Sequence, residues 1–338
     1  MLENKTKSTH ILVVLASTVI VVAGLKLAAG ILIPLLLASF IAILAIPFMH
    51  FMSRHRVPEA ISVVVVLLVL IALVMAVASF IGGTVNAFYH DIPLYEQRFH
   101  SLTGQFVGWL NAHGFEVSNS AVRQLFNSGQ IMSTATAILN SVRGMLTNTL
   151  LILLIIMFIL LEASGFPNKL RRAFGEQTQM LSHFKGVSKG VQFYLMLKTI
   201  ISLVTGLLVW FFLWLLDVPY ASLWGVTAFI LNYIPTVGSF VAAIPAILIS
   251  LIMIDPFTAG LVAIVYVVVN TLLGSVLEPR LMGHSLGISP LVVFLSLVFW
   301  GWVWGPIGMI LCVPLTMVVK IALETNPNSR WLAVLLDR

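Results

Sequence analysis

An uncharged stretch of 33 residues, Ala221 to Met253, constrains the fold most, because polar and helix-breaking residues interrupt its middle. One crossing of a hydrocarbon core about 30 Å thick needs about 20 apolar helical residues, and two crossings need about 40. The stretch is therefore too long for one crossing and short for two. Pro235 and Gly238 predict a break, since proline removes a backbone donor and clashes with the preceding turn. Broken backbone at membrane depth is stable only inside protein or beside a watery cavity.

A second uncharged stretch, Ser289 to Val319, repeats this pattern. Gly305, Pro306 and Gly308 interrupt it near its middle. Two interrupted apolar segments in one half of a membrane protein are the best sequence indication of a transporter's binding site. The alternative interpretation is a pair of long, kinked helices that bind nothing.

The composition excludes a soluble globule, since 60% of the 338 residues are hydrophobic and only 9% are charged, against a usual 25% or so. The net charge of +6 does not indicate a nucleic-acid partner, because the cations are scattered over loops between apolar runs. The single cysteine, Cys312, excludes an intrachain disulfide and a cysteine metal cluster. We therefore expect a polytopic, all-α membrane protein in contact with the lipid bilayer.

The apolar runs predict about eight membrane segments. They are residues 11–25, 28–51, 61–81, 145–161, 200–216, 221–253, 257–277 and 289–319. We divide the chain into N-terminal membrane helices (1–83), an external amphipathic helical region (84–143), a membrane helix (144–163), cytoplasmic basic amphipathic helices (164–197), a transport unit (198–320, with broken segments 221–253 and 288–320) and a cytoplasmic tail (321–338).

The external region is predicted to be a small helical cap, because apolar residues between Tyr95 and Trp109 recur every three or four positions. A break is expected near 111–114, followed by a short helix near 122–126 and another that starts near Ile131. The cap contains His90, His100 and His113, but no pair has the i, i+4 spacing typical of a metal site, so we expect no metal.

Orientation follows from the basic residues, which cytoplasmic loops carry in excess. Placing both termini in the cytoplasm puts most cations on that side and the cap outside. Arg280 then separates two topologies. If each broken segment crosses once, the loop 278–284 is external, whereas two opposed re-entrant hairpins make it cytoplasmic. The basic Arg280 favours the opposed hairpins, which form an inverted pair around one midplane site.

The candidate substrate-binding residues are the polar and helix-breaking ones at the breaks. Asn232, Tyr233 and Asn270 supply neutral donors and acceptors, and broken helix ends add free backbone groups. The full predicted set is Asn232, Tyr233, Pro235, Gly238, Asn270, Gly305, Pro306 and Gly308. We expect Glu278 and Arg280 to form a gating ion pair near the cytoplasmic mouth. The alternatives are ordinary interhelical hydrogen bonds for the two asparagines and a structural ion pair at a helix end.

Two long motifs in these regions resemble the autoinducer-2 exporter (AI-2E) family. The first consists of Leu231 to Ser239 followed by Ala242 to Pro245; the second consists of Leu277 to Gly283, Pro290 to Leu297, Phe299 to Trp302 and Gly305 to Met309, and ends with Pro314 to Thr316 and Lys320. Weaker similarity at 56–58 and 197–199 extends the resemblance over nearly the whole chain.

The resemblance implies a bacterial inner-membrane homo-oligomer, pentameric in this family, that exports the small signal molecule autoinducer-2 by moving a transport unit against a scaffold. It implies no cofactor. Related branches are linked to sodium/proton exchange, so an antiporter is one alternative, although it would need a carboxylate deep in the membrane. A non-transporting scaffold or sensor is another. We expect no enzyme, because no nucleophile–base pair or metal cluster is visible within the spans.

Overall fold

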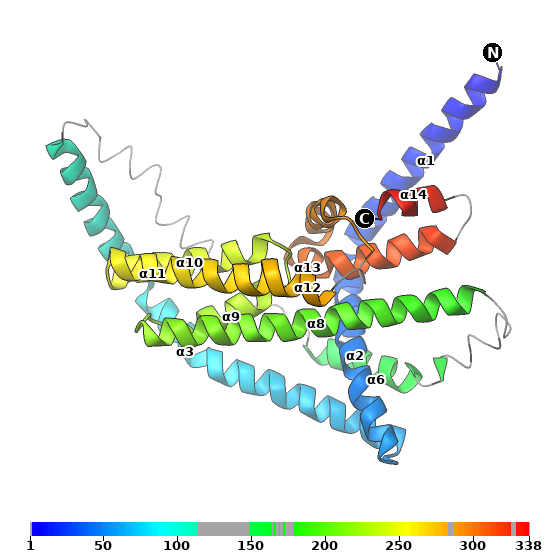
Figure 1. The fold of residues 1–338 in the computed structure, drawn as a ribbon, viewed down its shortest axis with the longest axis horizontal. Helices are drawn as coiled ribbons and strands as arrows, with labels where there is room; N and C mark the ends of the chain where they lie inside the picture. Colours follow the sequence, from blue (N-terminus) through cyan, green and yellow to red (C-terminus); the bar gives the residue numbers. More distant parts are fainter. Residues whose placement is uncertain are drawn as a thin grey trace. The chain divides into compact units, whose positions relative to one another are not determined.

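The described residues form helices and no strand, which confirms the all-α prediction for this part of the chain. The computed structural model describes residues 2–113, 149–163, 179–282, 287–325 and 329–337, together with 165, 166, 169 and 172. Its helices are α1 (Leu2–Leu27), α2 (Ala29–Arg54), α3 (Glu59–Ala112), α6 (Thr149–Ala163), α8 (Gln179–Leu215), α9 (Ala221–Leu231), α10 (Val237–Met253), α11 (Pro256–Val269), the π-helix η1 (Asn270–Leu277), α12 (Glu278–Met282), α13 (Pro290–Thr325) and α14 (Arg330–Leu335) (Figure 1).

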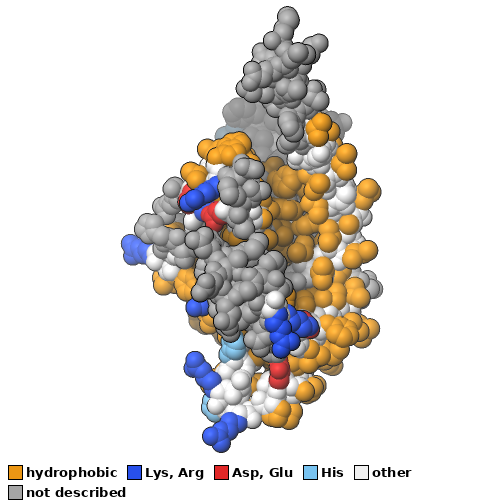
Figure 2. All heavy atoms as spheres, turned by 90° about the vertical axis from the view of Figure 1, so that its right-hand side faces the viewer, with side chains coloured by type: hydrophobic (Ala, Val, Ile, Leu, Met, Phe, Trp, Pro, Cys, Tyr) orange, Lys and Arg blue, Asp and Glu red, His pale blue; other side chains and the backbone are white. Residues whose placement is uncertain are grey.

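Five of the described helical stretches are long and apolar enough to cross a membrane: 29–54, 59–84, 189–215, 256–282 and 290–324. Shorter apolar helices lie at 16–27, 149–163, 221–231 and 237–253. Large hydrophobic side chains are widely exposed on them, and Figure 2 shows a broad hydrophobic area on the face viewed there. Exposed apolar area on this scale needs a nonaqueous partner, so these helices contact lipid.

The chain divides into two compact units, which we describe separately. One contains residues 1–64, 150–195 and 284–338, and the other contains residues 65–149 and 196–283. Helices α3 and α8 each contribute residues to both units. The segment 198–320, expected to be one transport unit, is divided between them, so that each unit contains one of the two broken segments.

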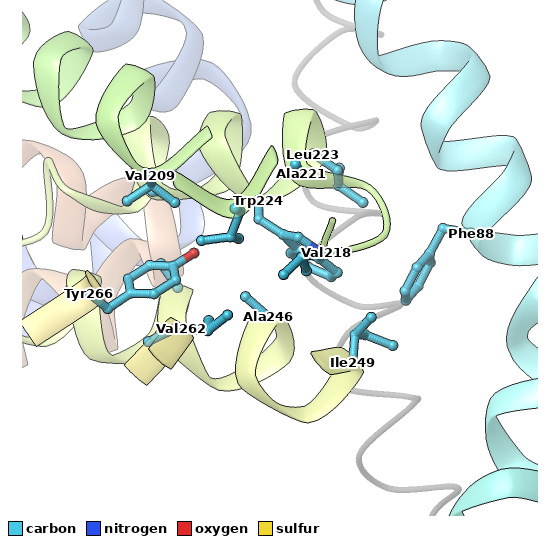
Figure 3. Packing of buried hydrophobic residues seen from close by; sticks show 14 of the residues in the cluster. Phe88, Val209, Val218, Ala221, Leu223, Trp224, Ala246, Ile249, Val262 and Tyr266 are labelled. Carbon is cyan, nitrogen blue, oxygen red and sulfur yellow. The ribbon is translucent and has the colours of Figure 1, made fainter. Parts of the chain in front are cut away.

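In the unit of 65–149 and 196–283, α9 and α10 form a hairpin that packs on α11 and on the second half of α8 (Figure 1). A buried core cluster joins these helices to α3, and it includes Trp224, Ala246 and Val262 (Figure 3). Helices α8 and α9 approach closely where Gly206 lies against Gly225, since a Cβ on Gly206 would be 2.8 Å from the Gly225 carbonyl oxygen. Small residues allow such close packing between membrane helices.

Helix α3 continues without a break through Gly82 and Gly83, so the amphipathic stretch after 84 is part of this 54-residue helix. It ends at Ala112, as the expected break near 111–114 requires. The helices expected near 122–126 and from Ile131 lie outside the described residues. In the same way α8 is continuous from Gln179 to Leu215, so the amphipathic part before 198 runs directly into the membrane span.

The extension of α3 holds the open end of the α9–α10 hairpin. Tyr95 donates a hydrogen bond to the Tyr220 hydroxyl at 2.5 Å, and Tyr220 in turn donates to Asp91. Arg98 donates to the Met253 carbonyl at 3.2 Å. Burial, followed by the hydrogen bond between them, raises the pKa of Tyr95; burial and the bond to Asp91 raise the pKa of Tyr220. Both hydroxyls therefore stay protonated and available as donors.

In the unit of 1–64, 150–195 and 284–338, α13 reverses direction at Gly305, where the backbone leaves helical geometry (φ 65°, ψ −147°). The Trp300 indole donates to the Thr316 hydroxyl at 3.1 Å, although a straight helix would separate residues 16 positions apart by about 24 Å. Lys320 likewise donates to the Gly287 carbonyl, which brings the two ends of the segment together. The second broken segment is thus also a helical hairpin.

Candidate functional site

The turn between α9 and α10 occupies residues 232–236, where the sequence predicts the break. Pro235 lies in this turn, and Thr236 adopts a left-handed φ of 57° before α10 begins. Gly238 lies so close to the end of α9 that a Cβ there would overlap with the Leu231 carbonyl oxygen. The hairpin can close this tightly only because position 238 has no side chain.

A network of neutral polar side chains surrounds the turn. Asn232, 5% exposed, donates from Nδ2 to the Ser202 hydroxyl of α8 at 3.0 Å. The Ser239 hydroxyl donates to Asn270 Oδ1 at 2.8 Å and also lies 3.5 Å from Asn232 Oδ1. The first hairpin therefore brings Asn232 and Asn270 to one network through Ser239. Amides and hydroxyls can exchange donor and acceptor roles, so such a network can bind an uncharged polar solute without moving charge.

One face of α8 continues the polar contacts from the hairpin turn toward α12. The Tyr233 hydroxyl donates to Thr199 at 2.8 Å, and Lys198 donates to both carboxylate oxygens of Glu278 at 2.8 Å. The Lys198 and Glu278 side chains are only 4% and 16% exposed. A buried pair of this kind is strongly coupled, because removal of either partner leaves an uncompensated charge.

The prediction that Glu278 forms an ion pair with Arg280 was wrong. The structure pairs Glu278 with Lys198, whereas Arg280 is exposed on α12 and forms no ion pair among the described residues. Sequence proximity suggested Arg280, but a residue two positions along a helix points away from its neighbour. A gating role for Glu278 stays a prediction, now with Lys198 as its partner.

Asn270 marks a change of helix type. The eight residues from Asn270 to Leu277 form a π-helix, in which the Glu278 amide donates to the Leu273 carbonyl five residues earlier. π-helical turns are rare and occur frequently at functional sites. Gly274 gives room to the Asn270 side chain, since a Cβ on Gly274 would be 3.0 Å from Asn270 Oδ1.

A small cavity lies beside this network. Its lining residues are Thr205, Val209, Ala228, Ser239, Tyr266, Val269 and Asn270. The centre of a water molecule can occupy about 10 Å³ of it, which is room for roughly one water. The cavity therefore has the size of a single small polar group.

The remaining predicted binding residues belong to the other compact unit. Gly305 provides the reversal of α13, Pro306 follows it, and Gly308 lies so close to α13's first half that a Cβ would overlap with the Trp300 carbonyl oxygen. The neighbourhood of this turn is aromatic, with Trp300 and Trp304 stacked at 4.9 Å between ring centroids. The Trp304 indole donates to the Leu25 carbonyl at 3.0 Å.

Sequence reasoning missed the α8 side of the network and the tyrosine of the cavity. Lys198, Ser202 and Thr205 recur at helical spacing on α8, and this pattern inside an apolar run could have indicated a buried polar face. Ser239 was visible only as part of a motif. Tyr266 gives no signal in the sequence, because a lone tyrosine in a membrane helix is indistinguishable from an interfacial one.

This chain has lipid-facing helices, two interrupted apolar segments that form hairpins, and a buried network of uncharged polar side chains. Together these features are those of a multi-pass membrane protein of the transporter class. The sequence model of the AI-2E family transporters matches residues 15–328, and the chain belongs to this family.

Three relatives align over nearly their whole length. The AI-2 transport protein TqsA of Escherichia coli K12 is 37% identical over 327 residues, which cover 97% of this chain and 95% of TqsA. YhhT of the same strain is 36% identical, with 97% and 94% covered. A Haemophilus influenzae protein is 37% identical, with 99% and 98% covered. The names of the last two state transport without a substrate.

Proposed function

We propose that this chain exports autoinducer-2, a small, uncharged, polyhydroxylated signal molecule, across the bacterial inner membrane. The observation that carries the proposal is the neutral amide–hydroxyl network of Asn232, Ser239 and Asn270 at the break of the first hairpin. The name of TqsA supports the choice of solute, at 37% identity over nearly the full length.

The chemistry of the network fits such a solute. An uncharged polyol gives up hydrogen bonds to water when it enters the membrane, and each unreplaced bond is costly. Amide and hydroxyl groups on three different helices replace those bonds without adding charge. A formal charge at the same place would favour an ion instead.

Transport follows if the α9–α10 hairpin or its neighbours move so that the network faces each side of the membrane in turn. Gly238 permits the tight turn, and the Lys198–Glu278 pair fixes α8 to α12 in the present state. We include in this proposal the opposed re-entrant arrangement of the two hairpins, cytoplasmic termini and a homo-oligomeric assembly.

Proteoliposomes loaded with autoinducer-2 test the proposal directly. Liposomes that contain the wild-type protein should release the solute faster than protein-free liposomes. The Asn232→Ala variant should reduce this flux about tenfold or more, although the purified variant still elutes as a monodisperse species. Wild-type flux equal to that of empty liposomes would refute the export function.

A sodium/proton antiporter is the second candidate, because Glu278 places a carboxylate with 16% exposure in a membrane helix. When sodium is added outside, such an antiporter would take up sodium in exchange for protons and alkalinise the liposome interior, and Glu278→Gln would abolish this pH change. The pairing with Lys198 disfavours this candidate, since a carboxylate neutralised by lysine has no need of a proton or sodium ion.

A further inference from the structure

The hydroxyl of Tyr266 is unusual among the described residues. It is the one buried side-chain nitrogen or oxygen atom there with no hydrogen-bond partner, and the residue is only 5% exposed. A buried hydroxyl without a partner costs free energy, and such a group in a native protein requires an explanation. Figure 3 shows the ring extending from α11 into the core, with the hydroxyl pointing away from its own helix.

The Tyr266 hydroxyl belongs to the lining of the small cavity, with the polar side chains of Thr205, Ser239 and Asn270. The described residues of this lining include no acid and no base. A cation would therefore find no carboxylate there, and an anion would find no positive charge. The charged pair between α8 and α12, Lys198 and Glu278, is self-neutralised by two hydrogen bonds. The lining thus has no full charge to pair with an ion, which favours an uncharged group.

The directions of the hydrogen bonds around the cavity limit further which uncharged group can bind there. The Thr205 hydroxyl uses its proton on the Ile201 carbonyl at 2.9 Å, and the Ser239 hydroxyl uses its proton on Asn270. Both oxygens are then left as acceptors, whereas the Tyr266 hydroxyl still has its proton to donate. Among uncharged groups a hydroxyl can both accept from Tyr266 and donate to Thr205 or Ser239, whereas a carbonyl or ether cannot donate to either oxygen.

We propose that this cavity is the subsite that binds one hydroxyl group of a neutral polyhydroxylated solute, and that Tyr266 selects solutes for that hydroxyl. The inference rests on the proposed export function and identifies where in the network the solute is recognised. The cavity has room for about one water, so it takes a single hydroxyl, and the rest of the solute lies outside it.

The test compares two tyrosines that lose only a hydroxyl. Tyr266→Phe should bind autoinducer-2 about two- to tenfold more weakly than wild type, which is the effect of one hydrogen bond, as measured by equilibrium binding to purified protein. Its melting temperature without solute should be equal or higher, because no protein partner is lost. Tyr95→Phe is the matched control: it loses the bond to Tyr220, so its melting temperature should fall and its affinity should not change.

D-ribose, a neutral polyhydroxylated sugar, and sodium chloride are the two further probes, and they separate this inference from the export function. If wild type binds autoinducer-2 and Tyr266→Phe binds it equally well, the inference is overturned and the export function stands. If wild type binds ribose in a Tyr266-dependent way but not autoinducer-2, the export function fails and the subsite stands. If neither autoinducer-2 nor ribose binds in a way that depends on Tyr266, or if sodium alone stabilises the protein in a Tyr266-dependent way, the subsite is overturned.

Discussion

The two hairpins have turns of similar geometry, but the residues around the two turns differ. In the first, Gly238 packs against the carbonyl of Leu231, seven residues earlier; in the second, Gly308 packs against the carbonyl of Trp300, eight residues earlier. A Cβ on either glycine would also lie 3.1 Å from the side chain of the residue four positions before it, Ile234 in one case and Trp304 in the other. The same steric requirement therefore closes both hairpins.

The chemistry beside the two turns is different. Amides and hydroxyls from three helices meet at the first turn, around Asn232 and Ser239. At the second, stacked tryptophans use their indole N–H groups on Thr316 and on the Leu25 carbonyl. An interrupted apolar segment thus indicates a hairpin, and the polar side chains from other helices at the first turn are the basis for proposing a binding site there.

The largest expected effect comes from the shared turn. Gly238→Ala and Gly308→Ala should each destabilise the protein by more than about 3 kcal/mol, because the new Cβ overlaps with backbone that cannot move aside. Gly260→Ala in α11 is the control, since a Cβ there has no atom within 4 Å and alanine favours the helix by up to about 1 kcal/mol. Melting temperatures in detergent give the comparison. Wild-type stability of either turn variant would show that the two hairpins do not share this requirement.

The next largest effect on stability should distinguish the buried ion pair of one unit from the more exposed ion pairs of the other. Glu278→Gln leaves Lys198 charged and buried, and should cost about 3–5 kcal/mol. Glu324→Gln should cost less than about 1 kcal/mol, because Glu324 is 38% exposed and Lys320 keeps Asp337 and the Gly287 carbonyl.

A double variant checks the cause of this difference. Lys198→Met with Glu278→Leu removes both charges and should regain most of the stability lost in Glu278→Gln. If the double variant is as unstable as the single one, packing and not charge explains the loss.

The sequence predicted both breaks because proline and glycine act on their own neighbours. Each turn has a proline with glycine close to it, Pro235 with Gly238 and Pro306 with Gly305, and the turns were found to within a few residues. A proline without such a glycine, such as Pro245 or Pro314, lies inside a helix. The division expected between residues 83 and 84 is not a helix end: α3 continues through Gly82 and Gly83, because a glycine pair without proline only lowers helix propensity.

The partners of the polar residues could not be predicted. Asn232 was identified as a candidate, but its bond to Ser202 joins residues 30 positions apart, and that of Ser239 to Asn270 spans 31. Such pairs depend on how the helices pack, and helical periodicity says only which residues share a face. The same limit explains why Glu278 was assigned to Arg280, which is near in sequence, instead of Lys198, which is 80 positions away.

Substitutions near the first turn should reduce transport, whereas substitutions near the second turn with a similar stability cost should not. Asn270→Ala removes the acceptor of Ser239 and should reduce autoinducer-2 flux about tenfold at a stability cost of about 1–2 kcal/mol. Thr316→Val removes the acceptor of Trp300 at a cost of about 1 kcal/mol, with flux unchanged. Equal loss of flux in both variants would mean that the aromatic turn also belongs to the transport site.

The smallest expected effect on transport comes from filling the space beside Asn270 of η1 or beside Met309 of the second hairpin. Gly274→Ala places a Cβ 3.0 Å from Asn270 Oδ1, so the amide must shift by a few tenths of an ångström and flux should fall about two- to threefold. Gly301→Ala in the second hairpin meets Met309 at 2.9 Å, and the methionine side chain can adapt because it is unbranched and flexible. Both variants should lose no more than about 1 kcal/mol of stability, and only Gly274→Ala should slow transport. If Gly301→Ala slows it as much, a small displacement in either hairpin is enough to affect transport, and the division into a polar and a structural turn is wrong.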